Sequence, residues 1–130
     1  MELERKNYSS GSAVEEKSGY SRMVEVGPFI YLAGTTAVKS DGTVHGEGNP
    51  YEQTKFIIEK LIDIMGKANA GAKNVTRIKV YTTDMSYAPE IAKAYSEYFF
   101  DIKPVLTMVG INMLNRPTQL VEIEMDAIKY

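Results

Sequence analysis

Acidic residues alternate with apolar ones along the segment Leu120–Ile128 with a strict period of two. Successive side chains of a β-strand point to opposite faces of the sheet, so Glu122, Glu124 and Asp126 are expected to share one face. A carboxylate held in a dry or like-charged setting has a raised pKa and can act as a general base. The alternative is that the three acids are solvated or paired with arginines. We expect them to face a polar space between subunits, with Glu122 in a ligand site.

Four further side chains could take part in the same chemistry. Tyr20 and Arg22 lie two residues apart in a predicted strand and should therefore share a face. A neutral tyrosine, with a pKa of about 10, can donate a hydrogen bond to a carbonyl oxygen or an imine nitrogen. A guanidinium can bind a carboxylate. The alternative roles are structural: packing for Tyr20 and an ion pair for Arg22. Ser86 and Thr107 carry small hydroxyls that could also contact a ligand, and their alternative roles are helix capping and strand formation.

Hydrophobic periodicity predicts the elements that must position these residues. A hairpin turns at Gly27-Pro28, and Gly34 is expected to break its second strand. Two amphipathic helices follow, the first from an Asn49 cap to a stop at Gly71 and the second capped by Ser86. Each element has one apolar face to bury, which a single sheet with both helices on one side achieves. The predicted strands, in the order ββαβαββ, span residues 20–26, 29–33, 75–83, 105–112 and 120–128.

This arrangement leaves one sheet face open. It should be polar with some aromatic residues, and we expect self-association to cover it. The residues expected on this face are Tyr20, Arg22, Thr82, Glu122 and Glu124.

Length, composition and charge further limit the classes of fold and function that the chain can have. The 130 residues predict a single domain, 1–130, of the α/β (α+β) class. The absence of cysteine excludes disulfide scaffolds and thiolate sites, and the single histidine, His45, excludes a multi-histidine metal site. We therefore expect no metal site, and because no motif suggests a cofactor, we expect none. No apolar run reaches the roughly 20 residues of a membrane span, and no secretory signal is visible, so we expect a cytoplasmic protein. A net charge of −2 without a basic stripe argues against a nucleic-acid partner.

Four segments, in this order, carry a resemblance to a known family. They are Gly19-Tyr20-Ser21, Tyr31-Leu32-Ala33-Gly34, the stretch from Asn74-Val75-Thr76 to Thr83-Asp84-Met85, and Val121-Glu122-Ile123-Glu124. Together they resemble the YjgF/RidA (Rid) superfamily over residues 18–128. The resemblance implies a chorismate-mutase-like fold and a homotrimer whose sheets form a central barrel, with a small-molecule site in each of three clefts between subunits.

The resemblance also implies an activity and a set of site residues. Studied members of the family hydrolyse enamines and imines, such as 2-iminobutanoate, to keto acids and ammonia without a cofactor. Tyr20 and Glu122 fall on the family's tyrosine and glutamate and are the expected catalytic residues. The expected substrate-binding residues are Arg22, Ala33, Gly34, Ser86, Leu106 and Thr107.

Leu106 is the main departure from the family pattern, because it occupies the position of the arginine that clamps the substrate carboxylate. Loss of such a charge-assisted contact costs about 1.5–3 kcal/mol. Ala33 replaces the family serine and Ser86 its asparagine, and Arg22 is a candidate substitute for the missing guanidinium. Three functions remain open: an enamine/imine deaminase, a non-catalytic trimer that binds a metabolite against an apolar wall at Leu106, and an RNA-directed translation inhibitor or endoribonuclease.

Overall fold

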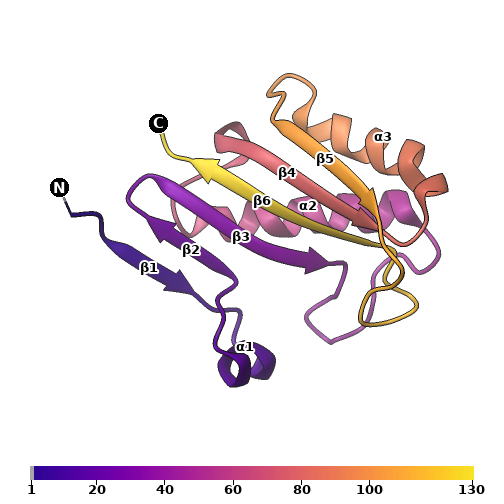
Figure 1. Ribbon diagram of the computed structural model, residues 1–130, viewed down its shortest axis with the longest axis horizontal. Helices are drawn as coiled ribbons and strands as arrows, with labels where there is room; N and C mark the ends of the chain where they lie inside the picture. The colour runs from indigo at the N-terminus through magenta and orange to yellow at the C-terminus, as the bar shows by residue number, and fades with distance from the viewer. Residues whose placement is uncertain (1) are drawn as a thin grey trace.

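A single twisted sheet of six strands runs through the computed structural model, which describes residues 2–130 (Figure 1). The strand order is β1-β2-β3-β6-β4-β5, and among these strands β4 and β5 pair in parallel whereas the other neighbours are antiparallel. The elements are β1 (Arg5–Tyr8), α1 (Ala13–Ser18), β2 (Met23–Val26), β3 (Phe29–Thr36), α2 (Pro50–Gly66), η1 (Ala72–Asn74), β4 (Val75–Thr82), η2 (Met85–Tyr87), α3 (Ala88–Phe99), β5 (Val105–Gly110) and β6 (Val121–Ile128).

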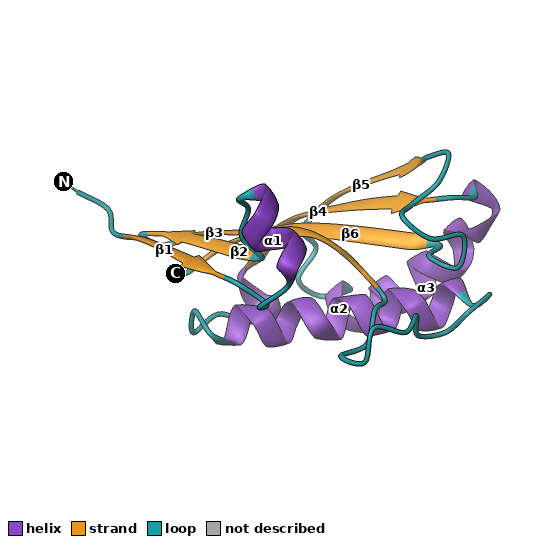
Figure 2. Cartoon of the chain, turned by 90° about the horizontal axis from the view of Figure 1, so that it is seen from below, coloured by secondary structure: helices purple, strands orange, loops and turns teal. Residues whose placement is uncertain are grey.

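The two long helices, α2 and α3, cover one face of the sheet, and the other face is left open (Figure 2). The order ββαβαββ is confirmed for β2 through β6, and so is the single sheet with both helices on one side. The sequence did not predict β1 and α1. The first has no apolar alternation in its four residues, and the second is only six residues long.

Helix α2 begins as predicted and ends earlier. The side chain of Asn49 accepts a hydrogen bond from the Glu52 amide at 3.0 Å, and Pro50 opens the first turn. The helix ends at Gly66 and not at Gly71, because Asn69 adopts a left-handed conformation with φ of 59°. The amide of Ala70 then bonds back to the Met65 carbonyl at 3.1 Å, which closes the helix end.

Helix α3 begins at Ala88 and is not capped by Ser86, so that prediction was wrong. The carboxylate of Asp84 accepts the Ser86 amide at 2.8 Å and caps the short turn η2 instead. Aspartate is a strong cap, and here it lies two residues before the expected serine. Pro89 occupies the first turn of α3, where its missing N–H costs nothing.

Strand β6 has the alternation that its sequence predicts. Its apolar residues are buried against α2, whereas its acids point to the open face and are only partly buried. Thr82, expected on the open face, is fully buried, and its hydroxyl donates to the Leu120 carbonyl at 3.1 Å. The buried residues of β6 are Val121, Ile123, Met125 and Ala127.

Strand β3 continues past Gly34 to Thr36, so the predicted break is wrong. Its pairing with β6 shifts register between Leu32 and Thr35, which marks a β-bulge. A bulge lets a strand continue while it turns its residues relative to the partner strand. It lies beside Glu122, which pairs with Thr36.

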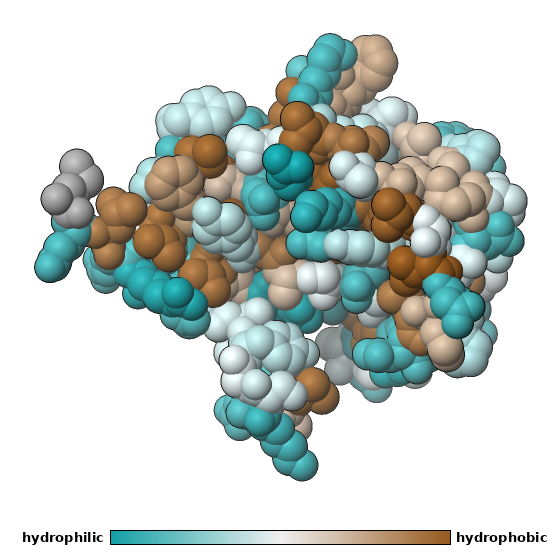
Figure 3. All heavy atoms as spheres, in the orientation of Figure 1, coloured by the Kyte–Doolittle hydropathy of each residue, from teal (hydrophilic) through white to brown (hydrophobic). Residues whose placement is uncertain are grey.

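The open face mixes apolar and polar side chains, as Figure 3 shows in the same view as Figure 1. Phe29 is 40% exposed and Tyr31 is 50% exposed. On the neighbouring strands, Tyr81 donates its hydroxyl hydrogen to Glu124, and Arg77 lies 3.7 Å from Asp126. The predicted combination of acids and aromatic residues is therefore present. Among residues 2–130, no helix is both long and apolar enough to cross a membrane.

Candidate functional site

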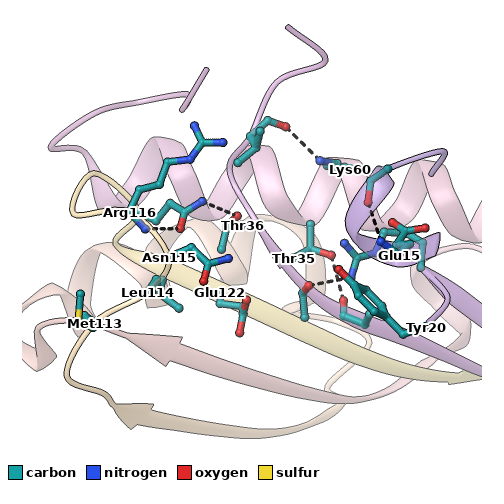
Figure 4. Close-up of a pocket in the computed structure, with 16 residues that line it drawn as sticks. Glu15, Tyr20, Thr35, Thr36, Lys60, Met113, Leu114, Asn115, Arg116 and Glu122 are labelled. Carbon is teal, nitrogen blue, oxygen red and sulfur yellow. Dashed lines mark hydrogen bonds between the residues drawn. The ribbon is translucent and has the colours of Figure 1, made fainter. Parts of the chain in front are cut away.

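A hollow of about 930 Å³ opens where β3 and β6 meet α1, helix α2 and the loop before β6 (Figure 4). Of the eight predicted site residues, Tyr20, Arg22, Ala33, Gly34 and Glu122 line it. They come from the segment before β2, from β3 and from β6. Residues about 100 positions apart in the sequence are therefore brought together at one site.

Glu122 lies against the backbone of Gly34. A Cβ atom at position 34 would stand only 3.0 Å from the Glu122 carboxyl carbon and 3.1 Å from Oε1. The absence of a side chain at Gly34 is thus what allows the carboxylate this position. Burial raises the pKa of Glu122, the charge of Arg22 opposes that effect, and the charge of Glu124 adds to it.

Arg22 reaches into the hollow from the segment just before β2, which begins at Met23 and not at Tyr20 as predicted. Its Nη2 donates to the Gly34 carbonyl at 3.0 Å, and the guanidinium carbon lies 5.9 Å from the centre of the Tyr20 ring. Its Nε is buried and finds no hydrogen-bond partner within residues 2–130. Across the same residues no carboxylate oxygen comes within 4.0 Å of the guanidinium.

Glu15 of α1 forms one wall of the hollow, and its carboxylate already accepts hydrogen bonds from neighbouring residues. Its carboxylate accepts hydrogen bonds from the Ser9 hydroxyl at 3.0 Å, from the Ser10 amide at 2.9 Å and from the Ser10 hydroxyl. Burial alone would raise the pKa of Glu15, but these bonds and the charge of Arg22 lower it below its ordinary value. Glu15 is therefore an ionised group that holds α1 in place.

Lys60 enters the hollow from α2 and was not predicted as a site residue. Its Nζ donates to the Val38 carbonyl at 3.0 Å, as the dashed line in Figure 4 marks. Burial lowers the pKa of Lys60, and the nearby charge of Arg22 lowers it further. The sequence carried a weak signal for this position, because Lys60 directly precedes Leu61 of the buried stripe and so borders the packed face of the helix.

The loop before β6 forms the opposite wall. Arg116 donates to the Gly42 carbonyl at 2.7 Å, and its amide donates to the Gln119 side chain at 3.0 Å. The same Gln119 amide group donates to the Thr36 hydroxyl at 3.1 Å. Underneath, the buried Gln53 accepts the Leu120 amide at 2.9 Å and so fixes the end of the loop. The sequence of the loop before β6 has no periodic pattern from which these contacts could be predicted.

The other three predicted residues do not line the hollow. Ser86 is exposed in η2. Leu106 and Thr107 lie on β5, an edge strand. Leu106 is aligned with the buried Ile78 of β4, so it points to the helix side of the sheet and is 42% exposed, whereas Thr107 points to the open face.

The site holds no arrangement of metal ligands. Within the described part of the chain, residues 2–130, no three His, Asp or Glu side chains are grouped to hold an ion. The donors in the hollow are carboxylates, hydroxyls, amides and cationic nitrogens. Such a set can bind a small polar molecule and transfer protons to and from it.

Residues 10–129 match the family described as Endoribonuclease L-PSP, and the chain therefore belongs to this family, the YjgF/RidA family. A crystal structure of a YjgF/YER057c/UK114 family member from Mycobacterium tuberculosis is similar, with a TM-score of 0.85 and 36% identity over 96% of this chain and 99% of that one. A RutC family protein of Pyrococcus abyssi is 34% identical over 85% of each chain. A 3-aminoacrylate deaminase, RutC, of Acinetobacter baylyi is 27% identical over 73% of this chain and 75% of its own.

Proposed function

We propose that the protein is an enamine/imine deaminase that hydrolyses a small imine in the hollow beside Glu122. The single observation that supports this most is the placement of Glu122, a partly buried carboxylate with a raised pKa, in one hollow with Tyr20 and Arg22. A general base works best when its pKa is raised toward the operating pH. The relative described as a 3-aminoacrylate deaminase supports the same reaction class.

The reaction needs only water and proton transfer. Glu122 takes a proton from a water molecule as the water oxygen bonds to the imine carbon. That proton is passed to the nitrogen, which gives a carbinolamine with one hydroxyl and one amino group. Glu122 then carries the hydroxyl proton to the amino nitrogen, the carbon–nitrogen bond breaks, and ammonia leaves as the carbonyl forms. In the proposed reaction the hydroxyl of Tyr20, which lines the same hollow, donates a hydrogen bond to the substrate. Arg22 bears the positive charge that a substrate carboxylate requires.

We propose further that three copies assemble around the open sheet face and that each cleft is completed by a neighbouring copy. In support, apolar and aromatic side chains are exposed on the open face, with Val105 of the edge strand β5 at 57% and Tyr31 of β3 at 50%. An exposed apolar edge strand is a template for association with another chain. In this assembly Ser86, Leu106 and Thr107 would reach the cleft of a neighbour. Analytical ultracentrifugation should give three times the monomer mass, and a monomer that persists at every concentration would contradict the assembly.

The activity can be tested with 2-iminobutanoate generated in situ beside a trapping nucleophile. The protein should accelerate loss of the imine, and Glu122→Gln should abolish the acceleration. Asp126→Asn is the matched control, since Asp126 is an acid on the same strand and face, lies 3.7 Å from Arg77 and does not line the hollow. No acceleration with any of several imines would leave the non-catalytic metabolite-binding trimer as the better account.

Arg22→Ala tests the anion-binding part of the proposal separately. Calorimetry should show about a tenfold or greater loss of affinity for a small carboxylate such as 2-oxobutanoate. An RNA-directed role has less support, because the net charge is −2 and the open sheet face carries three acids. Retention of single-stranded RNA at low salt that weakens as salt rises would favour that role instead.

A further inference from the structure

Two cationic side chains lie together at one end of the hollow. Arg22 comes from the segment before β2 and Lys60 from α2, and both line the cavity. Each donates to a carbonyl of the same short stretch of chain, Arg22 to Gly34 at 3.0 Å and Lys60 to Val38 at 3.0 Å. Carbonyls in β3 and just after it therefore hold both cations in one hollow, near enough for the charge of Arg22 to lower the pKa of Lys60.

Neither cation is neutralised by the protein. Through residues 2–130, no carboxylate comes within 4.0 Å of either nitrogen group. The charge of Arg22 lowers the pKa of the buried Glu15, but the carboxylate oxygens of Glu15 accept hydrogen bonds from Ser9 and Ser10. Glu122 senses Arg22 as well, from beyond 4.0 Å. A carbonyl partner accepts a hydrogen bond without cancelling the charge.

The pKa of Lys60 shows that its charged form is disfavoured in this position. Burial lowers the pKa of Lys60, and the charge of Arg22 lowers it further. Two like charges held together in a partly buried place are unfavourable until an anion joins them. Both groups keep unused donors, because an ammonium has three N–H bonds and a guanidinium has five, and Nε of Arg22 is buried without a partner in the described chain.

We propose that Lys60 and Arg22 together bind the carboxylate of the substrate, and that Lys60 determines the specificity of the site for anions. The position of the two cations relative to Glu122 also indicates the class of substrate. Arg22 is bonded to the Gly34 carbonyl, and the Glu122 carboxylate lies over Gly34. A carboxylate on the two cations places its neighbouring carbon toward Glu122, as a 2-imino acid requires. The choice of a 2-imino acid rests on the proposed deaminase function, whereas carboxylate binding does not.

The competing role for Lys60 is purely structural, as a tie between α2 and the Val38 carbonyl. The two roles differ in what they predict for a ligand without charge. We would measure, by calorimetry, the affinity of the whole protein for 2-oxobutanoate and for its neutral amide, 2-oxobutanamide. Lys60→Met should weaken binding of 2-oxobutanoate about tenfold or more and leave the amide unaffected. Lys60→Arg should retain binding of the anion.

Lys67→Met is the matched control, because it removes the same charge from the exposed C-terminal cap of the same helix. It should change neither affinity. If Lys60→Met does not fold, Lys60→Gln, which removes the charge and keeps an N–H donor, gives the same comparison. Equal losses for the two ligands, an unchanged affinity for 2-oxobutanoate, or no binding of 2-oxobutanoate by the unaltered protein would each overturn the proposal.

The outcome is separable from that of the deaminase proposal. Selective loss of the anion in Lys60→Met supports the carboxylate site even in a protein that hydrolyses no imine. Conversely, imine hydrolysis that depends on Glu122 but is unaffected by Lys60→Met overturns the role of Lys60 and leaves the deaminase standing.

Discussion

Replacing Gly34 with alanine should impair the site while leaving the fold intact. The new Cβ would stand 3.0 Å from the carboxyl carbon of Glu122 and 3.3 Å from its Cγ. Carbon atoms pack comfortably at about 3.5–4.0 Å, so the carboxylate must move by about 0.5–1 Å. A displacement of that size at a reacting group can cost about 100-fold in rate. We expect kcat/KM for imine hydrolysis, in the trapping assay described above, to fall about 10-fold to 100-fold.

The stability of the same variant should change little. Gly34 does not adopt a left-handed conformation, so alanine fits its backbone, and the atoms that must move belong to the end of a flexible side chain. Gly→Ala at a compatible position gains about 0.4–1 kcal/mol, which offsets part of the strain. Gly66→Ala is the control, because its Cβ meets nothing within 4 Å at the end of α2. Full activity in Gly34→Ala, or a loss that merely follows unfolding, would refute the reasoning.

Three further substitutions test the electrostatics and the scaffold. Glu122→Gln should stabilise the fold at neutral pH, because burial raises the pKa of Glu122 and so disfavours its charged form in the folded state. The gain should vanish in urea titrations well below the unfolded pKa of about 4.3, where Glu122 is protonated in both states. Glu25→Gln should cost about 1–3 kcal/mol at neutral pH, because the hydrogen bond from Lys129 stabilises the carboxylate and lowers the pKa of Glu25. That stabilisation is present above the unfolded pKa and is lost as pH falls through the folded value, which urea titrations across acidic pH would follow. Gln53→Leu should cost roughly 2–4 kcal/mol by urea unfolding, because the buried Leu120 amide and a loop carbonyl lose their partner.

Each of these has a clear contrary result. A gain in Glu122→Gln that is the same at both pH values would show that charge is not its cause. A cost in Glu25→Gln that persists at low pH would point to packing. An unchanged unfolding midpoint in Gln53→Leu would mean that the loop before β6 is not held by this amide.

The sequence predicted those parts of the fold that depend on a repeating pattern. The apolar face of α2 and the alternation of β6 follow directly from spacing, since each has a single face to bury against the other. The end of α2 at Gly66 did not follow, because the left-handed turn at Asn69 competes with the more obvious Gly71. Likewise, Asp84 caps the short turn η2 ahead of α3, and the expected Ser86 cap of α3 is not formed.

The candidate site was only partly accessible to the same reasoning. Glu122 stands out because a strict alternation places it. Lys60 does not, because it belongs to a helix whose visible signal is its apolar stripe, and its approach to Arg22 depends on how the end of β3 folds. The register of β3 against β6 also shifts between Leu32 and Thr35, and the sequence pattern of the strand did not predict this bulge.

If Lys60 binds the substrate carboxylate as proposed, it substitutes for the cation that the resemblance implies at position 106, and this substitute lies in the hollow only once the chain is folded. Leu106 lies on β5 and points to the helix side of the sheet, away from the hollow of its own chain. Lys60 approaches the hollow from α2, where it lies beside Arg22 and no acid within 4.0 Å in residues 2–130 neutralises it. A site without a guanidinium at position 106 but with the ammonium of Lys60 should still bind anions in preference to neutral ligands. The anion should then be bound by a side chain of α2. Removing charge at Lys60 should therefore reduce carboxylate binding far more than adding an arginine at Leu106 restores it, and calorimetry on Lys60→Met with and without Leu106→Arg would measure both effects.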